Sequence, residues 1–283
     1  MKLATWNIQW GRGADGRVDL GRIVDDARRF GDFDVLCLQE VSAGVPELAG
    51  CDGRDQFVEI ATRLPGYTVV SGIAIDGLGA SGRRRQFGNM ILSRYPVMQV
   101  FRHLLPWPPD PGVLSMQRIA LETTLATPLG PLRVTTTHLE YYSAKQRHAQ
   151  VIRLRELQQE AVAHAHAPRI AEPSDGPFFG SVRAAPAILT GDFNFLPDSP
   201  ERALLMSAID PSTPSYQDTW EATHRGEQHA PTVGLHDKKQ WPDAPFTFDY
   251  IFASSDLMPR VRRTAVDAVS AASDHQPMMI ELA

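Results

Sequence analysis

The stretch Leu189-Thr190-Gly191-Asp192-Phe193-Asn194 decides the fold, because it joins an apolar run to two polar side chains. The run that begins at Ala187 contains β-branched residues, which predicts a short buried strand. Asp192 and Asn194 are compatible with an ordinary Asx turn after such a strand. The same two side chains also suit a strand end that opens into an active site.

Three other stretches place polar residues beside an apolar run. Thr5-Trp6-Asn7-Ile8-Gln9-Trp10 and Val35-Leu36-Cys37-Leu38-Gln39-Glu40 each end such a run with polar residues, and Ser273-Asp274-His275 precedes the last one. Strand ends of this kind aim their side chains into a shared cleft. Because Mg²⁺ prefers a few carboxylate and amide oxygens, the pattern predicts a site for a hard cation.

The order of apolar runs predicts a layered α/β protein with a mixed sheet, since strands and helices alternate only in places. The predicted strands are Leu3–Ile8, Val35–Gln39, Tyr67–Ser71, Asn89–Ser93, Ile119–Ala126, Leu132–Leu139, Ala187–Thr190, Asp249–Ala253 and Met278–Leu282. The predicted helices are Asp19–Phe30, Gln56–Arg63, Ala144–His164 and Pro200–Ala208. We find no internal repeat or domain boundary, so we expect a single domain over residues 1–283.

Three stretches are predicted to be loops, namely 72–88, 168–186 and 210–245, which are rich in glycine, proline or polar residues. Loops of this length in a compact domain are often functional. The first carries Arg83-Arg84-Arg85, which is either a solvated charge run or a contact for the phosphate or nucleic acid of a substrate.

The composition limits the choice of function. The chain has 283 residues, a formal net charge of −5 and a pI of about 6.0, which argues against binding to duplex nucleic acid through an overall positive field. Its 2 cysteines make neither a disulfide framework nor a cysteine zinc site. The polar residues near the N-terminus do not fit a signal peptide, and no apolar stretch approaches the about 20 residues of a membrane span. We therefore expect a cytoplasmic protein without a transmembrane segment, and infer no obligate protein partner.

These residue types suit hydrolysis of a phosphate ester. A bound metal neutralises the charge of the ester and lowers the pKa of its water. A histidine held by a carboxylate takes a proton from the attacking water or stabilises the developing charge. We expect Asp249, which begins a predicted strand, to orient His275. His138 and the asparagines are suitable donors to phosphate oxygens.

Seven short motifs occur in an order that resembles the endonuclease/exonuclease/phosphatase superfamily. They are Thr5-Trp6-Asn7, Leu38-Gln39-Glu40, Gly88-Asn89-Met90-Ile91-Leu92-Ser93-Arg94, Thr137-His138-Leu139-Glu140, Gly191-Asp192-Phe193-Asn194, Asp249-Tyr250-Ile251-Phe252 and Ser273-Asp274-His275. The resemblance implies a four-layered α/β sandwich, in which two packed mixed β-sheets are flanked by helices. It also implies a phosphodiesterase or nuclease that depends on Mg²⁺ or Mn²⁺.

The same resemblance implies a role for each site residue. The metal ligands would be Glu40, with help from Asn7 and Asp274. The groups acting on the substrate or on water would be Asp192, Asn194, His138, and His275 paired with Asp249. The substrate is left open as nucleic acid, phospholipid or a small phosphodiester.

One stretch departs from the deoxyribonuclease branch of that family. In that branch a glutamate precedes the fourth strand and pairs with the counterpart of His138, but Arg85-Gln86-Phe87-Gly88-Asn89 contains no carboxylate. The departure argues against a protonated His138 that acts as a general acid. It also argues against a nonspecific deoxyribonuclease.

Other functions are kept open at this point. A phosphomonoesterase of the same superfamily fits the motifs, and so does a module that binds phosphate without cleaving it. Gly11-Arg12-Gly13-Ala14-Asp15-Gly16 matches the dinucleotide-binding pattern. However, the predicted helix begins only near Asp19, too late to present its N-terminus to a pyrophosphate.

Overall fold

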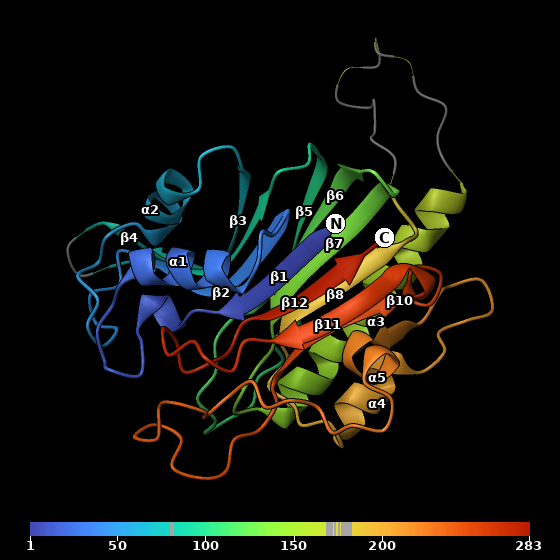
Figure 1. Cartoon of the computed structure of the whole chain (residues 1–283). Coiled ribbons are helices and arrows are strands. Elements are labelled where there is room, and N and C mark those ends of the chain that lie inside the picture. The colour runs from blue at the N-terminus through green and yellow to red at the C-terminus, as the bar shows by residue number, and fades with distance from the viewer. Residues whose placement is uncertain (80–81, 168–171, 173, 175, 177–182) are drawn as a thin grey trace.

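The computed structural model describes residues 1–283 except 80–81, 168–171, 173, 175 and 177–182. Within that part of the chain, two six-stranded sheets are packed together (Figure 1). The first has the order β11-β12-β1-β2-β4-β3 and the second the order β5-β6-β7-β8-β10-β9. The β1–β2 and β7–β8 pairs are parallel and the other pairs antiparallel, so both sheets are mixed.

The strands of the first sheet are β1 Lys2–Asn7, β2 Val35–Ala43, β3 Thr68–Leu78, β4 Arg84–Ser93, β11 Val261–Val266 and β12 Met278–Leu282. The strands of the second sheet are β5 Val97–Leu104, β6 Ile119–Thr127, β7 Gly130–His138, β8 Ala187–Asp192, β9 Tyr216–Asp218 and β10 Asp249–Ser254. The helices are α1 Leu20–Phe30, α2 Gln56–Arg63, α3 Ala144–His166, α4 Pro200–Met206 and α5 Thr219–Thr223, with 3-10 turns η1 Gln9–Gly11 and η3 Met258–Arg260.

Helices cover the outer faces of the two sheets. Figure 1 shows α1 and α2 on the side of the first sheet and α3, α4 and α5 on the side of the second. The apolar stripe predicted for α3 is confirmed, since Val151, Leu154, Leu157, Ala161 and Val162 are all buried. The predicted four-layered α/β sandwich is therefore confirmed. None of the described helices is long and apolar enough to cross a membrane.

Alternation along the strands decides which side chains enter the space between the sheets. In β8, Ile188 belongs to the apolar core between the sheets and Leu189 to the core under α3. Because successive side chains point to opposite faces, Asp192 has the same direction as Ile188. The same parity places His138 with Val134 in β7 and Asp249 with Ile251 in β10. The core between the sheets thus ends in polar groups at one edge.

The predicted loop 72–88 is wrong for most of its length. Residues up to Leu78 continue β3 and residues from Arg84 begin β4, and the two strands form an antiparallel pair. Two of the glycines that suggested a loop, Gly72 and Gly88, are required by close packing. A Cβ on Gly72 would lie 2.9 Å from Leu121, and one on Gly88 would lie 2.0 Å from the carbonyl oxygen of Gly72.

Four further elements were not expected from the sequence. They are β5, β9, β11 and α5, and the predicted loop 210–245 contains β9 and α5. The half-buried pattern of β5 and the three-residue length of β9 leave no clear apolar run. Most of the predicted loop 168–186 lies outside the described residues.

The glycine packing in the β3–β4 pair predicts different effects for two alanine substitutions. Gly88→Ala is expected to lower the free energy of unfolding by about 1–3 kcal/mol, because the added carbon overlaps the neighbouring backbone. Gly77→Ala in the same strand pair is the control, since its Cβ would meet only Arg85 at 3.9 Å. Urea unfolding measures both, and equal stabilities would contradict the packing argument.

Candidate active site

Three polar side chains lie in one row across the second sheet. The register pairs Asp192 of β8 with His138 of β7 and with Asp249 of β10. All three side chains face the first sheet and are buried. Neighbouring strands are about 4.8 Å apart, so the register alone brings these groups close together.

Glu40 enters the same space through an irregularity in β2. Alternation would give Glu40 the direction of Leu38, which belongs to the core under α1 and α2. However, the pairing with β4 shifts between Leu38 and Val41, and Glu40 has a left-handed φ of 59°. A β-bulge of this kind redirects a side chain. It brings a Glu40 oxygen to 3.9 Å from His138 Nδ1.

Asn7 connects the two sheets at this edge. Its Nδ2 donates to Glu40 Oε1 at 3.1 Å and to Asp192 Oδ2 at 2.9 Å. Its oxygen accepts a hydrogen bond from the backbone nitrogen of Gln9 at 3.0 Å. The fully buried amide therefore holds one carboxylate from each sheet.

His275 is held by the carboxylate that the sequence predicts. Its Nδ1 lies 2.8 Å from Asp249 Oδ2, which also accepts from the hydroxyl of Thr232 at 2.7 Å. Its Nε2 faces Asp192 Oδ2 at 3.7 Å. Burial alone would lower the pKa of His275, but Asp249, Asp274 and Asp192 outweigh it and hold that pKa well above its usual value.

Asp274 is fixed by donors that nothing in the sequence pattern indicates. Its Oδ2 accepts from Gln9 Nε2 at 3.0 Å, Gln240 Nε2 at 2.9 Å and Trp241 Nε1 at 3.0 Å. Gln240 and Trp241 lie in the stretch predicted to be a loop. They approach Asp274 only because that segment folds back over the strand edge.

His138 and Asn194 complete the polar floor. His138 Nε2 lies 3.5 Å from Asp192 Oδ2, and the Asn194 side chain donates to the carbonyl oxygen of Leu139 at 2.9 Å. Burial lowers the pKa of His138 well below its usual value, and Arg118 and His275 lower it further. A pKa below the usual value favours the neutral form of His138 at pH 7.

Arg118 is a buried site residue that the motifs do not include. Its Nε lies 3.2 Å from Glu140 Oε2, whereas its Nη1 is buried without a hydrogen-bond partner. Arg118 lines the same pocket as His138. A guanidinium with an unused donor in a pocket suits an anion. Its place directly before β6 is the only signal that the sequence offers.

Arg147 and Gln150 of α3 support the segment after β7. Arg147 Nη1 donates to the carbonyl oxygens of Glu140 and Tyr141, each at 2.9 Å. Gln150 Oε1 accepts from the Glu140 backbone nitrogen at 2.8 Å. They hold Glu140 and Tyr141, which follow His138 and Leu139, so their role is structural.

The three consecutive arginines separate in space. Arg85 lines the pocket, whereas Arg84 is exposed and donates to Asp76 at 2.8 Å. Arg83 is exposed and is not among the residues that line the pocket.

Backbone strain is concentrated at this site. Four non-glycine residues in the described part of the chain have a positive φ, namely Gln9, Trp10, Glu40 and Asn194. All four line the pocket. Such conformations cost on the order of 1–3 kcal/mol each and persist only where the surrounding structure imposes them.

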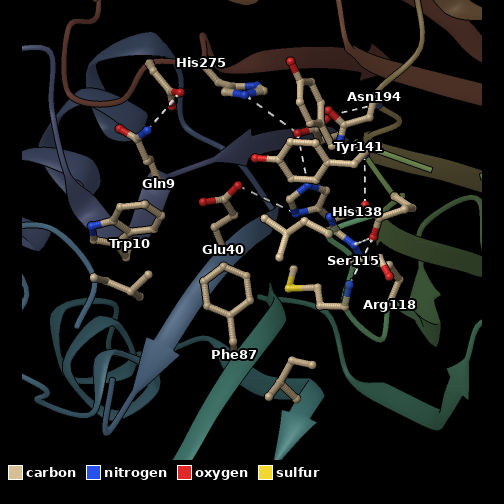
Figure 2. Close-up of a pocket in the computed structure, with 18 of the residues that line it drawn as sticks. Gln9, Trp10, Glu40, Phe87, Ser115, Arg118, His138, Tyr141, Asn194 and His275 are labelled. Atoms are coloured by element: carbon tan, nitrogen blue, oxygen red, sulfur yellow. Dashed lines mark hydrogen bonds and ion pairs between the residues drawn. The ribbon is translucent and has the colours of Figure 1, made fainter. Parts of the chain in front are cut away.

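The pocket has a volume of about 560 Å³ and two unlike sides. Figure 2 shows Glu40 near its centre, with His138 and Arg118 on one side, Trp10 on the other and the Phe87 ring below. Asp192, Asn194, Asp274 and His275 also line the pocket.

The donor set fits a divalent cation at Glu40. No interaction of its second oxygen, Oε2, is found within the described residues. Burial and the neighbouring Asp274 raise the pKa of Glu40 to about 7, and burial raises the pKa of Asp192 to about 6. A cation would relieve this accumulation of carboxylates. For Asn7 to offer an oxygen to the ion, its amide must turn and give up its hydrogen bonds with Glu40, Asp192 and Gln9.

A second acid-rich cluster is less suited to a metal. Ligand atoms of Asp192, Asp249 and His275 all lie within 4.8 Å of one another. In this cluster Asp249 Oδ2 is already bonded to His275 and Thr232, although Asp249 Oδ1 is buried without a hydrogen-bond partner. Glu40 is less buried than Asp249 and its Oε2 has no interaction among the described residues, so we place the candidate metal site at Glu40.

Residues 4–275 match the model of the Endonuclease/Exonuclease/phosphatase family. The chain belongs to this family. Members of the family are generally phosphoester hydrolases that depend on a divalent metal. No curated protein sequence matches the chain.

Solved structures with the same fold include two named phosphatases. A mannosyl-6-phosphatase from Bacteroides thetaiotaomicron matches the whole chain and 99% of its own length, with a TM-score of 0.66 and 17% identity. A 3′ phosphatase from Neisseria, bound to a product DNA hairpin, matches the whole chain and 99% of its own, with a TM-score of 0.63 and 18% identity. TDP2 from Caenorhabditis elegans matches 99% of the chain and 95% of its own, with a TM-score of 0.60 and 20% identity. At these identities the likeness shows the fold alone.

The raised pKa of Glu40 predicts a pH-dependent stability in the absence of metal. The folded pKa of about 7 exceeds the reference value of 4.5, so the folded state binds more protons between these values. Stability should therefore fall as pH rises from about 4.5 to about 8. Glu40→Gln lacks this titration, and its stability relative to the wild type should rise by on the order of 1–3 kcal/mol over that range.

Urea unfolding in chelator, repeated across that pH range for both proteins, measures the difference. Mg²⁺ or Mn²⁺ at pH 8 should stabilise the wild type more than the variant, because the cation binds the ionised carboxylate of Glu40. Parallel pH profiles, or equal stabilisation by metal, would count against a cation site at Glu40.

Proposed function

We propose that this protein is a divalent-metal-dependent phosphoesterase that hydrolyses its substrate by in-line attack of water, with phosphodiesters as the first expectation. The observation that carries the proposal is the convergence of Asp192, His275 and Glu40 from three separate segments. Asp192 faces His275 Nε2 at 3.7 Å, and both line the pocket with Glu40.

Asp192 is the group best placed to position the attacking water. Its Oδ1 is fixed by the backbone nitrogen of Asn194 at 2.9 Å, and its Oδ2 by Asn7 at 2.9 Å. A carboxylate held by two donors keeps one orientation, which reduces the entropy lost when water and phosphate meet. Asp192 is then the acceptor of the proton that the water loses.

His275 and His138 are suited to the charge that develops on phosphate. Asp249 occupies His275 Nδ1, so Nε2 is the atom that faces the pocket. An N–H at that atom donates to a non-bridging phosphate oxygen in the transition state. Neutral His138 and the unpaired Nη1 of Arg118 are further donors on the same side.

Glu40 would hold the Mg²⁺ or Mn²⁺, and Asp274, with Asn7 after its amide turns, would face the same ion. When bound, the ion supplies charge neutralisation at the phosphate and a lower pKa for water.

Replacement of His275 should abolish turnover. His275→Ala removes the donor fixed by Asp249, and we expect kcat to fall by about 10²–10³-fold or more. Hydrolysis of a chromogenic phosphodiester and of the matching monoester, with Mg²⁺, Mn²⁺ or chelator, is the measurement. His148→Ala is the matched control, because His148 is exposed on α3.

The two substrates separate the alternatives. Turnover of the monoester alone would replace the phosphodiesterase proposal with a phosphomonoesterase. Full activity of His275→Ala, or activity in chelator, would contradict the mechanism. A folded protein that binds phosphate and cleaves neither ester would be the binding module instead.

Arg118 should bind the phosphate of the substrate. Arg118→Met keeps much of the side-chain volume but removes the free Nη1, so kcat/KM should fall by about 10–100-fold. Arg153→Met is the control, because Arg153 pairs with Glu156 and Glu160 on the surface of α3. Steady-state kinetics with the better ester measure the effect, and unchanged kcat/KM would remove Arg118 from the site.

A further inference from the structure

The pocket contains an apolar chamber beside the catalytic groups. Its residues are Trp10, Val45, Leu48, Ile75, Phe87 and Met116. They come from η1, the segment after β2, strands β3 and β4, and the segment before β6. Convergence of several segments on one apolar surface, directly beside Glu40, makes the chamber part of the substrate site rather than a surface irregularity.

We propose that the chamber holds the organic group of the substrate, which is the phosphate ester of a compact, uncharged, apolar alcohol. The proposal rests on the phosphoesterase function above and specifies its substrate class. The pocket volume of about 560 Å³ is that of a small-molecule site. Phosphate at Arg118 and His138 leaves the apolar side for the remainder of the ester.

The six residues of the chamber offer no free side-chain donor to a hydroxyl-rich group. Among its six residues only Trp10 carries a polar side-chain atom, and its Nε1 donates to the carbonyl oxygen of Ala49 at 3.0 Å. A sugar placed there would lose its hydrogen bonds to water without replacement. We therefore expect a sugar phosphate to bind poorly in this chamber.

The charges around the chamber also disfavour a nucleic acid strand. Arg85 and Arg118 are the arginines among the described residues that line the pocket, and no lysine lines it. A groove that follows a nucleic acid backbone needs a series of cations. The net charge of −5 gives no general attraction for a polyanion.

Trp10 forms a rigid wall of the chamber. Its left-handed backbone is fixed because its carbonyl oxygen accepts from Gln56 Nε2 at 2.8 Å. The indole Nε1 donates to the carbonyl oxygen of Ala49, so both the backbone and the ring of Trp10 are held. A surface that is already ordered binds an apolar group at lower entropic cost.

The test compares phosphate esters of primary alcohols that differ in the polarity of the organic group. 2-Phenylethyl phosphate, propyl phosphate and mannose 6-phosphate are all esters of primary alcohols, and each is measured as the monoester and as its methyl diester. A short single-stranded oligonucleotide is included. With the full chain and Mg²⁺ or Mn²⁺, kcat/KM should be at least about 10-fold higher for the phenylethyl ester than for the others.

Variants of the chamber should reduce that preference. Phe87→Ala and Met116→Ala each remove apolar surface, so the phenylethyl-to-propyl ratio of kcat/KM should fall by about 5-fold or more. Phe101→Ala is the matched control. Phe101 is a half-buried phenylalanine on β5 outside the pocket. Thermal unfolding confirms that each variant is folded.

The outcomes separate the chamber from the phosphoesterase function. Equal kcat/KM for the phenylethyl and propyl esters, or a preference for mannose 6-phosphate or the oligonucleotide, would overturn the chamber proposal. The proposed phosphoesterase function would remain. If no ester is cleaved, calorimetry with 2-phenylethylphosphonate and propylphosphonate decides. Tighter binding of the first, lost in Phe87→Ala, would support the chamber while hydrolysis fails, and equal binding would overturn it.

Discussion

The side-chain amide of Asn7 donates to Glu40 in the first sheet and to Asp192 in the second, and the catalytic edge depends on this buried contact. The carboxylates of Glu40 and Asp192 share one amide donor, so they lie close enough to repel each other, and burial increases the repulsion. The amide hydrogens offset part of it. They also fix the distance between the two sheets at the place where the chemistry is proposed. The pKa of each carboxyl nevertheless remains above its usual value, which leaves the site suited to a cation.

The other two carboxylates of the site, Asp249 and Asp274, are also held by hydrogen bonds from neighbouring side chains. Asp249 is bonded to His275 and Thr232, and Asp274 to a tryptophan and two glutamines. Each carboxylate is thus held in one orientation by its partners. The Nη1 of Arg118 is a buried donor without a hydrogen-bond partner, and this is why Arg118 is assigned to the anionic phosphate of the substrate. The left-handed backbone conformations at the pocket have the same purpose, because they direct the side chains of these residues into the site.

Family membership and substrate class rest on different observations. The family follows from a match over residues 4–275, and the fold from two packed mixed sheets. Neither selects among the esters cleaved by proteins of this fold, since function depends on the site and not on the architecture. The apolar chamber with Trp10 and Phe87 is the feature of this chain that bears on substrate. It is built by segments whose sequences carry no motif.

The sequence by itself determined most of the strands around the core and which polar residues end them. Apolar runs and the polar residues beside them are local properties, so Asn7, Glu40, Asp192 and His275 could be predicted to share a cleft without coordinates. Only the tertiary structure showed how Glu40 reaches that cleft, because its direction depends on a bulge against β4. It also decided that residues 72–88 form strands, that Arg118 faces the pocket, and that a distant loop fixes Asp274. These features depend on contacts between segments far apart in the chain, and no local pattern records such contacts.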